Sequence, residues 1–168
     1  LNPEEETLRT SGVLTLRCEA ESSTGPRFLL NSRHAVLEFV SVEGTGVANV
    51  ELNMAGPGHA AARYARIDLL EPARRGDEVQ LRFECRGAGK GYQIRIDPDV
   101  ATASWTDVWY PYPDDYSGRS MSQRMSVTGT TAIRMPGDWR SLSAGRLVGR
   151  TTEGEEAIET WRLDVPMA

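Results

Sequence analysis

The chain has 168 residues, of which 39% are hydrophobic and 26% are charged, and its formal net charge is −5. This length and composition are typical of one soluble globular domain with a sizeable core, and a negative charge argues against nucleic-acid binding, which needs a basic face. An apolar run of about 18 residues, the length needed to span a membrane, is absent. We expect a single domain over 1–168, and because residue 1 is Leu rather than Met, we expect it to be excised from a longer chain or processed.

Hydrophobic and polar residues alternate with a period of two, which is typical of strands with one buried and one wet face. In chain order, we expect strands at 13–20, 35–42, 47–53, 64–70, 77–86, 91–97, 125–134, 142–149 and 159–165. Glycine-rich turns such as "EGTG", "RRGD" and the acidic "TEGEE" separate them, and no window shows a helical stripe. The sequence therefore predicts an all-β fold, a two-sheet antiparallel β-sandwich of about ten strands.

Two cysteines, Cys18 and Cys85, fall on positions that the alternation turns inward. Two interpretations are open. The cysteines are two buried free thiols, since free cysteine is among the most buried residue types, or they form one disulfide. The spacing does not choose between these two interpretations.

Motifs for catalysis or metal binding are weak. The glycine-rich segment 87–91 departs from a phosphate-binding loop and reads as a hairpin turn. His34 and His59 stand in no zinc or nucleophile motif, and Asp97 and Asp99 supply fewer oxygens than calcium requires. We therefore expect no cofactor, no metal and no catalytic residue in this chain.

The segment "SWTDVWYPYPDDY", residues 104–116, holds five of the twelve aromatic residues. These candidates for an interface or ligand surface are Trp105, Trp109, Tyr110, Tyr112 and Tyr116. They fit a contact surface for another domain, where aromatic residues carry much of the binding energy, or a shelf on which sugars stack.

Pro111 and Pro113 remove two backbone donors, so this segment should run along a sheet edge or over a rim rather than form a central strand. We expect Trp109 to be mostly buried and to close the end of the core. Tyr110, Tyr112 and Tyr116 should lie nearer the rim.

The order of four segments from residue 67 onward carries a resemblance to a known family. They read "IDLLEPARRGDEVQLRFECRGAG", "VWYPYP", "MSVTGTTAIRMPGDWRSLSAGRLVG" and "ETWRLDVP". Their order resembles the N-terminal β-sandwich domain of the aminopeptidase N family of zinc metallopeptidases, in a divergent bacterial form. The matching residues are Pro72, Gly76, Asp77, Trp109, Tyr110, Pro111, Pro136, Gly137, Trp139, Gly145, Trp161 and Pro166. The resemblance covers about the last 100 residues well and the first 60 only by strand count.

The resemblance implies a non-catalytic N-terminal scaffold and docking domain, whose partner is an adjacent catalytic or pseudo-catalytic domain of the same parent protein. The family's zinc-binding motif is absent from this chain, and "DPDVATASWTD" replaces the stretch that helps to anchor the substrate's amine in peptidase members. The divergent relatives are often membrane-linked, but the compartment of this protein stays open. The alternative hypothesis is a stand-alone carbohydrate-binding β-sandwich module that uses the aromatic shelf.

Overall fold

The computed structural model describes residues 1–2, 5–31, 35–55, 63–89, 94–96, 99–103, 108–113 and 127–167. For several residues at strand ends, among them Trp109 and Tyr110, it describes the backbone only. Residue contacts divide the chain into a larger unit, Asn2–Ser117, and a smaller unit, Gly118–Ala168 with Leu1. The single domain over 1–168 stays a prediction.

In the described ranges, all regular secondary structure is β-strand, and every pairing of strands is antiparallel. The predicted all-β fold is therefore confirmed. The count differs, because these residues form fourteen strands in five sheets rather than about ten strands in two. None of the described segments is a helix with the length and hydropathy needed to cross a membrane.

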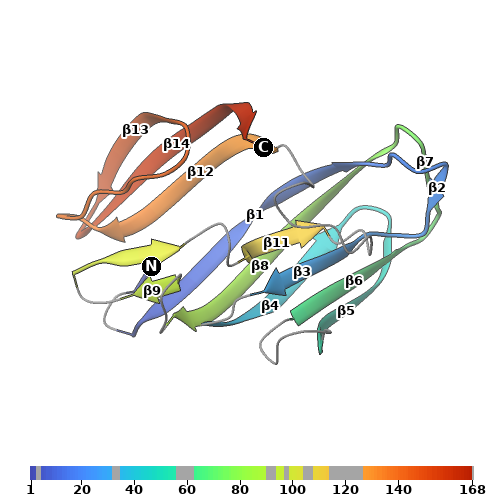
Figure 1. The fold of residues 1–168 in the computed structure, drawn as a ribbon, viewed down its shortest axis with the longest axis horizontal. Coiled ribbons are helices and arrows are strands. Elements are labelled where there is room, and N and C mark those ends of the chain that lie inside the picture. The colour runs from blue at the N-terminus through green and yellow to red at the C-terminus, as the bar shows by residue number, and fades with distance from the viewer. Residues whose placement is uncertain are drawn as a thin grey trace. The chain divides into compact units, whose positions relative to one another are not determined.

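The first sheet of the larger unit has the order β1-β8-β4 (Figure 1). Its strands are β1 (Thr7–Arg17), β8 (Glu78–Gly89) and β4 (Ala35–Gly44). The alternation predicted from the sequence is present, since Leu81 and Cys85 are fully buried while Arg82 between them is exposed. The outer face carries charged residues, including the ion pair of Arg9 with Glu84 at 2.8 Å.

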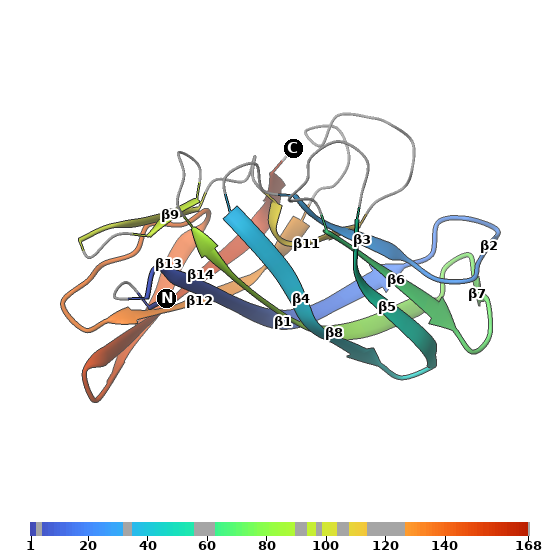
Figure 2. The same ribbon diagram turned by 90° about the horizontal axis from the view of Figure 1, so that it is seen from below.

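The second sheet of the larger unit has the order β11-β3-β6-β5 (Figure 2). Its strands are β11 (Val108–Pro113), β3 (Arg27–Asn31), β6 (Arg63–Leu69) and β5 (Val47–Ala55). Phe28, Ala65 and Ile67 on one face are at most 1% exposed. Because β4 contacts β3 and β6, the apolar faces of the two sheets form a common core.

The chain passes from one sheet to the other at the turn between β4 and β5, so two edge strands meet there (Figure 2). Asn53 on β5 joins them, since its amide accepts a hydrogen bond from the Phe39 backbone N–H and donates one to the Phe39 carbonyl, both at 2.8 Å. Asn53 has a φ of 55°, a conformation that asparagine tolerates better than most residues. The side chain thus replaces the ladder bonds that β4 lacks on this side.

Four short strands complete the larger unit in two separate pairs, β2 with β7 and β9 with β10. Their bounds are β2 (Ser22–Ser23), β7 (Ala73–Arg74), β9 (Ile94–Ile96) and β10 (Ala101–Ala103).

The smaller unit contains a three-stranded sheet of order β12-β14-β13 (Figure 1). Its strands are β12 (Val127–Pro136), β14 (Glu156–Met167) and β13 (Arg146–Glu153). The acidic "TEGEE" segment is the hairpin tip, as predicted, with Glu153 opposite Glu156 and Gly154 at a φ of 64°. One face is polar, and Arg134 on it pairs with both glutamates.

Candidate functional site

The aromatic segment enters the second sheet as β11, and it lies at the edge of that sheet. The pairing with β3 is irregular between Val108 and Tyr112, which fits a strand that carries Pro111 without a backbone N–H. Pro111 is less than 2% exposed. For residues 108–113, the predicted edge position is confirmed among the strands that the structure describes.

The expected rim position of Tyr112 is wrong, because its side chain is only 8% exposed. Pro113 lies opposite Phe28 and Tyr112 opposite Leu29, so Tyr112 is on the sheet face that Phe28 does not share. A row of paired residues crosses all four strands of the sheet on that face: Tyr112, Leu29, Tyr64 and Met54.

This row, which we call the tyrosine row, is an apolar layer rather than an open surface. Tyr64 is also 8% exposed, and the Arg27 guanidinium carbon lies 4.6 Å from the centre of its ring, within range of a cation–π interaction. A sugar-stacking shelf needs exposed ring faces, so Tyr112 does not supply one.

The other aromatic candidates lie outside what the structure describes. Trp105 and Tyr116 fall in gaps, and for Trp109 and Tyr110 only the backbone is given. The burial of Trp109 and the rim positions of Tyr110 and Tyr116 therefore stay predictions.

Both cysteines are free thiols, so the disulfide interpretation does not hold in this structure. Cys85 is 1% exposed, and burial raises the pKa of its thiol to about 12. Cys18 is half-buried rather than fully buried, and its sulfur lies 3.4 Å from the carbonyl oxygen of Ala20.

The remaining polar candidates form no site in the described ranges. His34, His59 and Asp97 lie in the gaps, and Asp99 is exposed. No three His, Cys, Asp or Glu side chains come together there in a geometry that could hold a metal. A surface hollow of about 470 Å³ lies over one end of the first sheet, and its charged lining includes both Arg86 and Glu38.

A buried glutamate that the sequence analysis did not single out organises the smaller unit. Glu159 is 1% exposed, because the alternation of β14 places it on the same face as Ala157 and Trp161. Arg150 lies directly opposite it on β13. The guanidinium of Arg150 forms an ion pair with the Glu159 carboxylate.

The same carboxylate binds the loop between β12 and β13. The backbone N–H of Ser141 donates to Oε2 of Glu159 at 2.8 Å, and the Ser141 hydroxyl donates to the same oxygen at 2.6 Å. Trp161 Nε1 in turn donates to the Ser141 hydroxyl at 2.8 Å. Arg150 also donates to the carbonyls of Trp139 and Gly137, at 3.0 and 2.6 Å. We call these four side chains, Ser141, Arg150, Glu159 and Trp161, the Glu159 network.

The hydrogen bonds from Ser141, and then the Arg150 guanidinium, lower the pKa of Glu159 to about 2, although burial raises it. The carboxylate is therefore ionised at neutral pH and does not act as a proton donor there. Its oxygens are engaged by Ser141 and Arg150, so its role is to hold the loop on the sheet. The sequence held one signal for this role: Glu159 is a charged residue at a position that the period-two alternation turns inward.

Comparisons with known proteins find solved structures that share this fold. No protein-family model and no curated protein sequence matches the chain. The crystal structure of an M1 zinc metallopeptidase from Deinococcus radiodurans matches with a TM-score of 0.68 and 19% sequence identity, over 98% of this chain and 36% of that chain. The chain has the fold of one part of an M1 zinc metallopeptidase.

Two further M1 structures support this fold. A mutant from Deinococcus radiodurans bound to a Tyr-Ser-Ala substrate matches at TM-score 0.65 and 16% identity. A two-domain M1 mutant bound to L-arginine matches at 0.65 and 18%. In both comparisons the match covers 98% of this chain and 36% of the metallopeptidase. The fold expected from the resemblance is confirmed, and the chain spans about a third of the length of these M1 proteins.

Proposed function

We propose that this chain is a non-catalytic scaffold and docking domain of an aminopeptidase-like metallopeptidase. The observation that carries the proposal is the coverage of the fold match, since 98% of this chain corresponds to only 36% of an M1 zinc metallopeptidase chain. The partner in this proposal is an adjacent catalytic or pseudo-catalytic domain of the parent protein.

The described polar groups favour a structural role. The amide of Asn53 ties two edge strands together, and the Glu159 network ties a loop to its sheet. In both cases a polar side chain holds backbone in one position, which suits a surface that must fit a neighbouring domain.

The aromatic segment supplies a candidate contact surface for that domain. With Tyr112 buried in the tyrosine row, the proposed contact residues are the other aromatic residues of the segment, Trp105, Trp109, Tyr110 and Tyr116. An edge strand is a suitable place for such a contact, and β11 has no neighbour on its outer side among the strands that the structure describes.

The isolated chain should release no chromophore from aminoacyl-arylamide substrates, with or without added zinc, and should purify without stoichiometric metal. The reason is that the proposed role leaves zinc binding and catalysis to the neighbouring domain. A chromogenic assay and metal analysis of the purified chain check this expectation. Turnover that follows the protein through purification and is lost on replacing Asp97 or Asp99 would overturn it.

A further inference from the structure

Three exposed aliphatic residues fall in one short stretch of the smaller unit, Ser141–Val148, which we call the 141–148 segment. Leu142 is 91% exposed, Leu147 45% and Val148 43%. The segment runs from the loop after β12 into β13, whose residues are exposed at all but one position. Single exposed aliphatic residues are ordinary, but a leucine as exposed as Leu142, with two more aliphatic residues close to it in sequence, makes this segment a candidate contact surface.

The 141–148 segment is fixed at two points. At its start, the Ser141 backbone and hydroxyl bind the buried Glu159 carboxylate. In its middle, Gly145 has a φ of 94°, and a Cβ there would lie 2.3 Å from the carbonyl oxygen of Arg162. Leu142 is therefore presented on a short loop held between two anchored positions, and a pre-organised contact loses less conformational entropy on binding than a free loop does.

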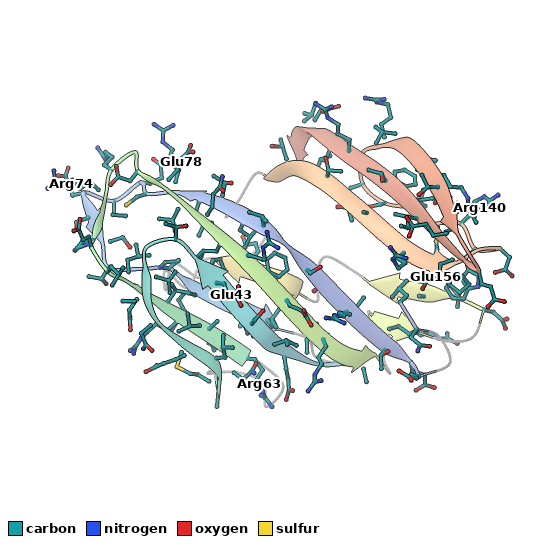
Figure 3. The ribbon with its side chains drawn as sticks, turned by 180° about the vertical axis from the view of Figure 1, so that it is seen from behind. Glu43, Arg63, Arg74, Glu78, Arg140 and Glu156 are labelled. Carbon is teal, nitrogen blue, oxygen red and sulfur yellow. The ribbon has the colours of Figure 1, made fainter. Side chains whose placement is uncertain are left out.

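Two arginine side chains accompany these exposed aliphatic residues, Arg140 directly before the segment and Arg146 within it. Arg140 extends from the loop between β12 and β13 (Figure 3). Arg146 is 69% exposed at its side chain and forms a loose pair with Asp164, at 3.8 Å. An apolar centre with a charged rim is the usual composition of a protein–protein interface, and this rim suits a partner with an apolar pocket edged by carboxylates.

We propose that the 141–148 segment is a docking element for the further domain of the metallopeptidase-like parent chain, with Leu142 as its apolar anchor. The inference rests on the proposed function. The occupant follows from the fold match, since the matched proteins continue for about two thirds of their length beyond the part that this chain resembles, and one of them is described as a two-domain enzyme.

The test uses the full-length parent protein with a photo-crosslinking amino acid, p-benzoylphenylalanine, in place of Leu142. The matched control carries it in place of Leu70, which is 70% exposed in the larger unit. Position 142 is expected to crosslink to peptides outside residues 1–168, identified by mass spectrometry, and position 70 is not. Crosslinks from position 142 that stay within residues 1–168, or none, would overturn the inference.

A second pair of variants separates this inference from the proposed function. The full-length protein is cut after residue 168 at an inserted protease site, which gives one fragment with residues 1–168 and one with the further domain. Leu142→Asp should weaken the association of these two fragments at least about tenfold, while Leu70→Asp should leave it unchanged. If the fragments associate equally well in both variants, the docking element is wrong and the proposed function stands. If the parent protein has no further domain, its intact mass shows this and both proposals fail.

Discussion

Replacing Glu159 with Ala is expected to lower the melting temperature of the smaller unit by on the order of 10 °C. The change leaves the guanidinium of Arg150, 23% exposed at its side chain, without its carboxylate, and leaves the backbone N–H of Ser141 without an acceptor. Breaking a buried ion pair from one side is strongly destabilising, because the remaining charge stays away from water. Thermal unfolding followed by the fluorescence of Trp139 and Trp161 checks the result.

Glu156 provides the matched control on the same strand. It pairs with Arg134 at 2.8 Å, but both side chains are 50% exposed. Glu156→Ala should therefore shift the melting temperature by no more than about 2 °C. Equal shifts for the two alanine variants would contradict the structural role of the Glu159 network.

The pH dependence of folding stability tests the Glu159 network in a second way. The pKa of Glu159 is about 2 in the folded chain, against an ordinary value of 4.5. The unfolded chain therefore takes up a proton first as the pH falls, and the stability that Glu159 contributes is complete above about pH 4.5 and is lost between pH 4.5 and pH 2. Glu159→Gln should remove this part of the acid dependence, which acid unfolding curves of the two proteins measure.

Tyr112→Ala should destabilise the larger unit by about 3–5 kcal/mol, the usual loss for a large buried aromatic residue. The ring lies in the tyrosine row at 8% exposure, opposite Leu29, and its removal deletes buried apolar surface from this face of the sheet. Tyr112→Phe keeps the ring and should have a much smaller effect. Denaturant unfolding measures both variants.

An exposed residue and a glycan array serve as controls for Tyr112. Val13→Ala, at a position 56% exposed on β1, should change stability by no more than about 0.5 kcal/mol. Two results together would favour the carbohydrate-binding hypothesis over the interface hypothesis: a Tyr112→Ala variant as stable as Val13→Ala, and specific sugar binding by the chain without substitutions.

The strands with clean alternation were predictable from sequence. In β8, Leu81, Phe83 and Cys85 are buried as predicted, because a period of two directly reports which face is inside. By contrast, β3 was missed because the apolar residues of "RFLLN" are three in a row, and Leu29 and Leu30 look alike but lie on opposite faces. Such a run gives no period to detect.

The positions set by pairing partners were not predictable. Tyr112 looked like a rim residue beside two prolines, and only its register with Leu29 places it in the tyrosine row. Glu159 looked like the polar start of a strand, and its partner Arg150 becomes evident only from the pairing of β13 with β14. Similarly, the alternation of the expected strand 159–165 puts Val165 on the same face as Trp161 and Leu163, yet Val165 is 72% exposed.

The central claim is that this chain serves as one non-catalytic part of a metallopeptidase-like protein. The most direct measurement is the intact mass and zinc content of the protein isolated from its source cells with an antibody against residues 1–168. We predict a substantially longer chain with zinc bound outside these residues. A mature protein that consists of these residues alone and carries no zinc would contradict the claim.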